Sequence, residues 1–389
     1  MTQDLRATIV EKFAAEHGAA PKVLARAPGR LEVLGNHTDY NEGFVLSSAT
    51  GFATWFALTP VKGRRCRLSN YTYDNGVEFD LDDLDSPKAG DWSNYVKGVI
   101  VELRKRGHKL GAFDGAVMST VPLSAGMSSS AALEISTCFA LSKAFGVDLP
   151  REDWARIGQR VENAYVGVNS GLLDQFSSIF GEHGRLILCD FRSVEVLKTV
   201  PLPEGYVFVV ANSMVKHNLV DSAYNARRAS CEAAAAAIAK RHPEVKALRD
   251  VPMAMLEECA AAMDFTDYRR AKHVVGEDER VIAAVEALGR GNIATFGALL
   301  FESHQSSVDN FENSCQELDY LVAMAKTLPG CLGARLSGGG FGGISIHLVE
   351  ADKAEAYAAR LGAAFKVQTG KDCHPLVCPS GDGASAELL

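Results

Sequence analysis

The segment VPLSAGMSSSAALEIS (residues 121–136) constrains the fold of this chain more than any other. An apolar stretch ends at Pro122, and Gly126 precedes three serines and a run of strong helix formers, which predicts a strand, a tight loop and a helix. The N–H groups at the start of such a helix attract anions. The segment matches neither G-x-x-x-x-G-K-[ST] nor G-x-G-x-x-G, so it predicts neither a P-loop enzyme nor a Rossmann dehydrogenase.

Three hydroxyl groups follow the glycine, on Ser128, Ser129 and Ser130. Hydroxyl groups donate hydrogen bonds to phosphate oxygens, and the Ser130 oxygen could also coordinate Mg²⁺. The alternative is a helix that is capped by a serine and binds no ligand, because serine is common at that position. The spacing alone leaves both interpretations open.

The chain of 389 residues is longer than a single hydrophobic core usually supports, so it predicts two domains. Two apolar strands, 185–191 and 206–213, flank a link with prolines and an acidic residue. We expect the boundary there, between domains 1–200 and 201–389. Strand-like segments cluster instead of alternating strictly with helices, which predicts an α+β fold rather than a doubly wound parallel sheet.

Apolar periodicity and turn residues predict the individual elements. The expected strands are 43–58, 64–69, 114–121, 185–191, 206–213 and 335–349. The expected helices are 1–18, 93–106, 129–145, 152–166, 222–241, 251–261, 277–289, 293–303, 315–328 and 352–366.

The charge and hydropathy pattern argues against several classes of partner. The net charge is −8 and no basic cluster is present, which gives little footing for a nucleic acid or an anionic membrane. No apolar run approaches the roughly 20 residues that span a bilayer. The nine cysteines fall mostly within apolar segments, as reduced core residues do. We therefore expect a cytoplasmic protein, and we expect it to be a monomer.

A second segment, APGRLEVLGNHTDYNEG (27–43), is unusually rich in polar residues. The side chains of Arg30, Asn36, His37 and Asp39 could pair with several hydroxyl groups of a sugar. A buried hydroxyl group is discriminated only when it finds a partner in the site. The alternative is an ordinary surface turn.

Two carboxylates and a glycine-rich stretch complete the candidates. Asp174 follows Glu162 by twelve residues and has apolar neighbours. A carboxylate in apolar surroundings is costly unless it is paired, so Asp174 is either functional or salt-bridged. A structural N-cap after Gly171 is the alternative. Five glycines between Gly338 and Gly343 allow a close approach of the backbone to a ligand or to another loop.

Three segments in this order, GRLEVLGNHTDYNEGFVL, PLSAGMSSSAALEIS and GARLSGGGFGG, resemble the three motifs of the GHMP small-molecule kinases. Within this superfamily the chain is most similar to the galactokinase family, and WSNYVKGVI (92–100) and NSMVKHNLVDSAYNARRASCE (212–232) extend the match. The resemblance implies an N-terminal domain like ribosomal protein S5 domain 2 and a ferredoxin-like C-terminal domain, with sugar and nucleotide between them.

The resemblance also implies an ATP-dependent sugar 1-kinase that converts galactose and ATP to galactose 1-phosphate and ADP. Asp174 then lies against the C1 hydroxyl group with Arg30 beside it, while Ser130 and Glu162 hold Mg²⁺. Phosphoryl transfer mainly needs positioning and charge neutralisation, which these residues could supply. The implied phosphate-binding residues are Gly126, Ser128, Ser129 and Ser130. The implied sugar-binding residues are Asn36, His37, Asp39, Gly171 and Tyr224.

Asn36 departs from the family pattern, which has a glutamate there that contacts the C6 hydroxyl group of the sugar. Asparagine keeps an acceptor, adds a donor and removes the charge. Either the amide binds the C6 hydroxyl group more weakly, or the pocket suits a sugar with a C6 carboxylate such as galacturonate. A C6-deoxy sugar or a pentose is a third possibility.

Some relatives of the family are non-catalytic galactose sensors, which have lost residues after the serine run. In this chain the run Ser128-Ser129-Ser130-Ala131-Ala132 is intact and Asp174 is present. Both features favour an active kinase.

Overall fold

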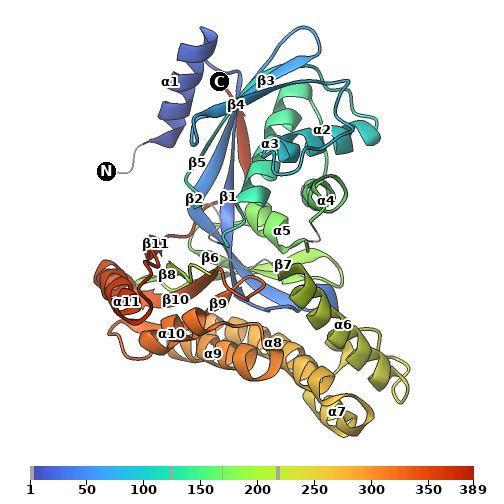
Figure 1. Cartoon of the computed structure of the whole chain (residues 1–389), viewed down its shortest axis with the longest axis vertical. Coiled ribbons are helices and arrows are strands. Elements are labelled where there is room, and N and C mark those ends of the chain that lie inside the picture. The colour runs from blue at the N-terminus through green and yellow to red at the C-terminus, as the bar shows by residue number, and fades with distance from the viewer. Residues whose placement is uncertain (1–3, 123–125, 169, 216–219) are drawn as a thin grey trace.

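The computed structural model describes residues 4–122, 126–168, 170–215 and 220–389. The molecule is elongated, with one sheet in each half and helices around both (Figure 1). The expected α+β fold class is confirmed. Residues 123–125 of the serine-rich segment, Asn169, and residues 216–219 of the segment 212–232 lie outside the described residues.

The first sheet is built around two long strands, β1 and β2. Its order is β12-β1-β2-β5-β3-β4, and β6 pairs with both β2 and β7. Residues 54–60 of β2 pair with β5 while residues 44–47 pair with β6, so this one strand serves two parts of the sheet. The bounds are β1 (Val23–Leu34), β2 (Phe44–Pro60), β3 (Arg65–Asn70), β4 (Asn75–Asp80), β5 (Phe113–Ser119), β6 (Arg185–Asp190), β7 (Glu195–Pro201) and β12 (Ser385–Leu388).

Helices cover both faces of this sheet. Successive residues of a strand point to opposite sides, and β2 has apolar residues on both of them. On β2, Ala57 packs with α1, whereas Phe56 and Leu58 belong to the core on the other face. That second core contains residues of α2 to α5. The helices are α1 (Leu5–His17), α2 (Asn94–Lys105), α3 (Ser129–Phe145), α4 (Arg151–Arg160) and α5 (Leu173–Phe180).

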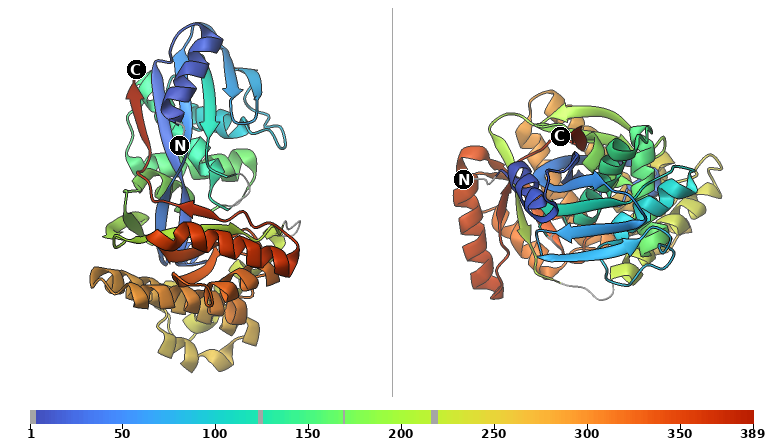
Figure 2. Two further views of the ribbon diagram at one scale, coloured as in Figure 1. Left: turned by 90° about the vertical axis from the view of Figure 1, so that its left-hand side faces the viewer. Right: turned by 90° about the horizontal axis from the view of Figure 1, so that it is seen from above.

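The second half contains an antiparallel sheet with the order β11-β8-β10-β9. Helices α9 and α10 pack against β9, and the left view of Figure 2 shows the orange helices lying beneath this sheet. Its strands are β8 (Tyr206–Asn212), β9 (Cys331–Ser337), β10 (Ile344–Glu350) and β11 (Leu376–Cys378). Its helices are α6 (Val220–Ala239), α7 (Met253–Glu258), α8 (Phe265–Gly289), α9 (Ile293–Ser306), α10 (Gln316–Ala325) and α11 (Ala354–Thr369).

The two halves share a hydrophobic core where β1 and β2 reach the second sheet. Leu31 and Leu46 from these strands belong to one buried cluster with Phe208 of β8 and Ile344 of β10. Met127, which precedes α3, lies in the same cluster. The shared core therefore fixes the positions of the loop before α3 and the loop after β1 relative to each other.

The glycine-rich stretch differs from the prediction of a single strand over 335–349. It forms two antiparallel strands, β9 and β10, joined by a turn. Gly338, Gly340, Gly342 and Gly343 in this turn have positive φ, which glycine adopts without strain. The predicted helix 152–166 also changes character, because α4 ends at Arg160 and a π-helical turn (Val161–Val166) follows.

The division near residue 200 stays a prediction, and the last strand qualifies it. β12 pairs with β1 through a register that aligns Val23 with Leu388, so the end of the chain belongs to the first sheet. Strands β1, β4, β7, β11 and β12 were absent from the predicted elements. β1 was not predicted because it is buried along almost its whole length and also carries polar residues. Its sequence therefore shows no alternation of apolar and polar residues.

Candidate active site

The serine-rich segment forms the start of a helix, as expected. Gly126 and Ser128 have left-handed backbone conformations, with φ of 62° and 56°, and α3 begins at Ser129. The N-cap residue Ser128 makes no side-chain capping hydrogen bond to this helix. The interpretation of a serine-capped helix is therefore wrong, and the first N–H groups of α3 have no side-chain cap within the described residues.

The Ser128 hydroxyl group instead donates a hydrogen bond to Oδ2 of Asp174. Asp174 lies in the first turn of α5 and is paired with Arg30 of β1: Nε and Nη2 of Arg30 lie 2.7 and 2.6 Å from Oδ1. Nη1 of Arg30 donates to the Gly126 carbonyl group over 2.6 Å. Three elements thus converge on one ion pair, and the N-cap alternative for Asp174 is also wrong.

A cavity of about 210 Å³ lies beside this ion pair. It brings together every residue that the sequence predicted for catalysis or sugar binding, from β1, the loop after it, α5, α6 and the turn between β9 and β10. The lining residues are Arg30, Glu32, Asn36, His37, Asp39, Ser170, Gly171, Leu173, Asp174, Tyr224, Gly338 and Gly339. Glu32 is the one ionisable lining residue that the sequence analysis did not select.

Asp39 faces the cavity next to Gly171. A Cβ atom on Gly171 would lie 2.2 Å from Oδ2 of Asp39, so only glycine allows this carboxylate its position. Burial and the charge of Glu32 raise the pKa of Asp39 to about 6. The cavity wall therefore holds closely spaced acceptor oxygens suited to hydroxyl groups.

His37 shapes the cavity without carrying charge. Its side chain is buried, which lowers the pKa to about 4 and keeps the ring neutral near pH 7. Nε2 lies 3.0 Å from the Gly339 carbonyl group and therefore donates, while Nδ1 accepts from the Tyr40 hydroxyl group over 2.8 Å. Both ring nitrogens thus have partners within the protein, and the ring packs 5.1 Å from Tyr224.

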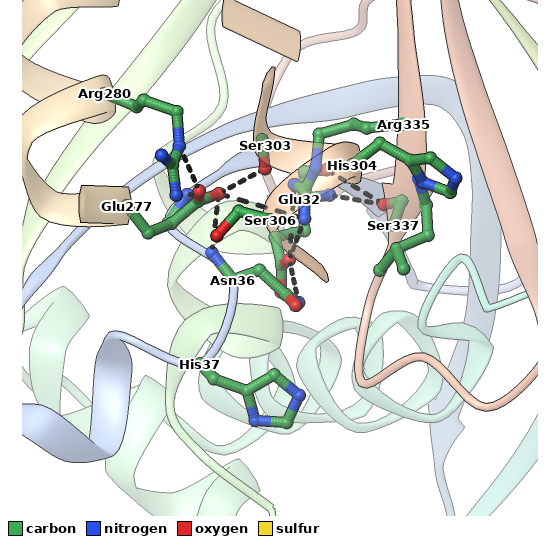
Figure 3. Close-up of polar contacts among 12 residues, drawn as sticks. Glu32, Asn36, His37, Glu277, Arg280, Ser303, His304, Ser306, Arg335 and Ser337 are labelled. Carbon is green, nitrogen blue, oxygen red and sulfur yellow. Dashed lines mark hydrogen bonds and ion pairs between the residues drawn. The ribbon is translucent and has the colours of Figure 1, made fainter. Parts of the chain in front are cut away.

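Asn36 is 1% exposed, and both its side chain and its backbone N–H group are hydrogen-bonded within the protein (Figure 3). Nδ2 donates to Oε1 of Glu32 over 2.7 Å and to the Gly338 carbonyl group over 2.8 Å. Oδ1 accepts from Asn313 over 2.9 Å. The backbone N–H group donates to Glu277 over 3.3 Å, so the residue is anchored to α8 as well.

Two buried carboxylates, Glu134 of α3 and Glu162 of the π-helical turn, lie near the ion pair and share Gln175 as a donor. Gln175 donates to Oε2 of Glu134 over 3.1 Å and to Oε2 of Glu162 over 3.2 Å. Burial raises the pKa of both carboxyl groups, and the charge of Asp174 adds to the shift at Glu162, which the Ser170 and Ser130 hydroxyl groups oppose. Oε1 of Glu134 has no hydrogen-bond partner in the described part of the chain.

This excess of negative charge suits a divalent cation near Ser130 and Glu162. The described residues contain no group of three or more His, Cys, Asp or Glu side chains that could hold a metal by themselves. Mg²⁺ usually takes one or two protein oxygens and completes its shell with water and phosphate oxygens. The two predicted metal ligands fit that mode of binding.

A second cavity of about 370 Å³ opens at the start of α3. Ser129 and Ser130 lie at one side of it, and the aromatic residues Tyr73, Trp92 and Tyr95 line the rest together with smaller side chains. An apolar pocket beside an anion-binding helix N-terminus suits a nucleoside base joined to phosphates. These aromatics were not among the predicted site residues, although Trp92 and Tyr95 fall in one of the segments that carry the family resemblance.

The described residues include no helix that is both long and apolar enough to cross a membrane.

Family models match the chain in three places: the GHMP kinases N terminal domain at 94–182, the GHMP kinases C terminal domain at 284–367 and the galactokinase galactose-binding signature at 11–60. Fold and site thus define a GHMP kinase, an ATP-dependent phosphotransferase with an alcohol group as acceptor.

Comparison with full-length relatives shows which family within the GHMP kinases the chain belongs to. The chain is 39% identical to a galactokinase of Chloroflexus aggregans (strain MD-66 / DSM 9485) over 378 residues, which is 97% of each chain. It is 39% identical to a galactokinase of Actinobacillus pleuropneumoniae serotype 3 (strain JL03) over 379 residues, 96% of this chain and 97% of the relative. The chain therefore belongs to the galactokinase family.

Solved structures agree with this placement. The Lactococcus lactis galactokinase complexed with galactose matches with a TM-score of 0.92 and 32% identity, covering 98% of this chain and 99% of that one. The Methanococcus jannaschii mevalonate kinase matches with a TM-score of 0.63 and 17% identity, covering 92% and 98%. The second likeness shows the shared fold alone.

Proposed function

We propose that this protein transfers the γ-phosphoryl group of ATP to the C1 hydroxyl group of galactose, giving galactose 1-phosphate and ADP. The observation that carries the proposal is the Asp174–Arg30 ion pair, which lines the polar cavity and is hydrogen-bonded to Gly126 and Ser128 just before α3. The names of the full-length relatives and the galactose bound to the Lactococcus lactis enzyme support the choice of sugar.

Asp174 is the proton acceptor in this proposal. Its carboxylate takes the proton of the C1 hydroxyl group as that oxygen forms a bond to the γ-phosphorus, while the bond from phosphorus to the bridging oxygen breaks and ADP leaves. Arg30 compensates the charge of Asp174 before the proton moves, and its side chain also reaches the phosphate-binding loop at Gly126. The N–H groups of α3 bind phosphate oxygens.

ATP binds with its base in the aromatic cavity and its phosphates at the start of α3. Ser130 and Glu162 would hold Mg²⁺, which when bound neutralises phosphate charge. The uncapped helix N-terminus and the buried carboxylates Glu134 and Glu162 support this placement. Ser128 contributes to phosphoryl transfer through Asp174, because its hydroxyl group donates a hydrogen bond to that carboxylate.

The structure disfavours a substrate with a C6 carboxylate. The Asn36 amide has no N–H group left for such a ligand, since both donate within the protein. Glu32 and Asp39 would also repel a carboxylate within the same cavity. A neutral sugar meets neither obstacle. The intact serine run and the ion-paired Asp174 likewise favour an active kinase over a sugar sensor.

We also propose that the protein acts in the cytoplasm as a monomer. All nine cysteines are free thiols, which is typical of reducing compartments.

The direct test is ATP-dependent phosphorylation by the purified protein, with galactose, galacturonate, N-acetylgalactosamine, glucose and arabinose as acceptors. We expect the highest kcat/KM with galactose, a phosphate on C1 by ³¹P NMR, and a loss of at least about 100-fold in Asp174→Ala. A different preferred sugar, or an Asp174→Ala variant with full activity, would contradict the proposal.

A further inference from the structure

Residue 36 is where the family carries the glutamate that contacts the C6 hydroxyl group, yet Asn36 is not free to make that contact here. An asparagine amide has two N–H groups, and both already donate, to Glu32 and to the Gly338 carbonyl group. The amide oxygen accepts from Asn313, and the residue is 1% exposed. The amide therefore serves the protein rather than a ligand.

Glu32 lies next to Asn36 and lines the sugar cavity. It follows Arg30 by two positions on β1, which places both side chains on the same face of the strand, and both line the cavity. Its Oε1 accepts the hydrogen bond from Asn36. Its Oε2 has no hydrogen-bond donor among the described residues.

The charge of Glu32 is compensated by Arg335, which does not line the cavity. Arg335 of β9 is fully buried, and its Nη1 and Nη2 lie 3.5 Å from Oε1 of Glu32. The same guanidinium donates to the Val33 carbonyl group over 3.0 Å, which ties it to β1. A buried carboxylate needs such compensation to stay in place.

A further carboxylate fixes the backbone that carries Asn36. Oε1 of Glu277 accepts from the N–H groups of Gly35 and Asn36 over 3.1 and 3.3 Å. It also accepts from Ser303 over 2.7 Å, and Arg280 binds Oε2 over 2.7 Å. Figure 3 shows this set of contacts joining α8, α9 and β9 to the loop after β1. Glu32 and Asn36 are therefore held in fixed relative positions.

We propose that Glu32 is the specificity-determining residue for the C6 hydroxyl group of the sugar, and that its Oε2 accepts the hydrogen bond from that group. Asn36 is a positioning residue, which holds Oε1 and leaves Oε2 to the cavity. The carboxylate of the sugar site is thus supplied four residues earlier in the chain than the family pattern implies. The substrate class is a neutral hexose with a free C6 hydroxyl group, and this inference rests on the proposed function.

The test compares galactose with 6-deoxygalactose, which lacks only the C6 hydroxyl group. Glu32→Gln keeps the shape of the side chain and removes its charge. We expect the ratio of kcat/KM for galactose to that for 6-deoxygalactose to fall at least about tenfold in this variant, because hydrogen bonds to charged acceptors are stronger than those to neutral ones. The change should lie mainly in KM, since the contact is remote from the reacting oxygen.

The double variant Glu32→Gln/Asn36→Glu is the matched control, because it moves the carboxylate to the neighbouring position. Recovery of at least half of the lost discrimination would support a direct role of the charge. A Glu32→Gln enzyme that loses activity equally toward both sugars would overturn the inference and show a structural role. A wild-type protein that phosphorylates neither sugar would instead refute the proposed function, so the two failures are distinguishable.

Discussion

Nη2 of Arg30 lies 2.6 Å from Oδ1 of Asp174, so one ion pair joins strand β1 to the first turn of α5 across the site. The side chains are 9% and 24% exposed, so the pair is largely shielded from water. The polar cavity and the start of α3, the proposed sites of the sugar and of the phosphates, meet at this contact. Its removal should therefore affect both the stability and the chemistry of the protein.

Arg30→Met should lower kcat at least about 100-fold and destabilise the fold by about 2 kcal/mol, because Asp174 loses its compensating charge. The measurements are steady-state kinetics and urea unfolding. Arg64→Met is the matched control: Arg64 pairs with Asp82 at the surface, where both side chains are more than half exposed. That change should cost less than about 1 kcal/mol and leave kcat intact. Equal effects of the two substitutions would contradict the prediction.

Gly171→Ala should raise KM for the sugar about tenfold, because the added methyl group occupies the place of Oδ2 of Asp39. A Cβ atom on Gly289, near the end of α8, would meet nothing within 4 Å. Gly289→Ala should therefore leave KM unchanged and hold or raise Tm. Sugar-concentration series at saturating ATP provide the comparison, and an unaltered KM in Gly171→Ala would show that Asp39 does not contact the sugar.

Glu162→Gln should raise the Mg²⁺ concentration needed for half-maximal activity at least about fivefold, because a metal-binding oxygen loses its charge. In metal-free buffer the same variant should have a higher Tm than the wild type, since burial and the charge of Asp174 raise the pKa of Glu162 and so disfavour its ionised form. Glu182→Gln, at an exposed side chain, is the control. Identical Mg²⁺ dependence in all three proteins would refute the assignment of Glu162.

Asp278 of α8 provides a pH-dependent prediction. Burial raises its pKa to about 7, with Glu277 and Asp190 adding to the shift and the Phe44 N–H group and Arg249 opposing it. An aspartate in an unfolded chain has a pKa of about 3.9. The folded protein therefore binds this proton more tightly than the unfolded chain, and the stability that the proton contributes is lost as the pH rises from about 4 to 7.

Asp278→Asn removes this titration, while its amide oxygen can still accept from the Phe44 N–H group, which now donates to Oδ1 of Asp278 over 2.7 Å. The free energy of unfolding of the variant minus that of the wild type should increase with pH across this window, by up to about 1.4 kcal/mol per pH unit. Urea unfolding at pH 5, 6, 7 and 8 measures the difference. A difference that does not change with pH would mean that Asp278 is ionised throughout.

Local sequence patterns predicted much of the fold correctly. The serine-rich segment begins a helix at Ser129 as expected, and the strands near 43–58 and 206–213 are present. The glycine-rich turn was predicted as part of one strand. Its glycines do not indicate that the residues on either side pair with each other as two antiparallel strands. The pairing of β12 with β1 joins residues more than 350 positions apart, and no periodicity within either segment encodes it.

The residue types at the site were evident in the sequence, but their working partners were not. The pattern singled out Asn36 as the unusual residue, whereas Glu32 was not among the predicted site residues. Only the close approach of β9 and of the segments on either side of it shows that the Asn36 amide is saturated by Glu32, Gly338 and Asn313. The same approach shows that Arg335 balances Glu32. Ser128 is a similar case, because its hydroxyl group bonds to a carboxylate 46 residues away instead of capping its own helix.

The sequence by itself determined the family, the helix that begins after the serines and the set of polar residues that line the first cavity. These features follow from backbone preferences and short spacings, which act within a few residues. The tertiary structure decided which carboxylate faces the cavity, which hydroxyl group serves Asp174 and which aromatics surround the second cavity. Those outcomes depend on hydrogen bonds and burial between distant segments, and such contacts exist only once the two sheets share a core.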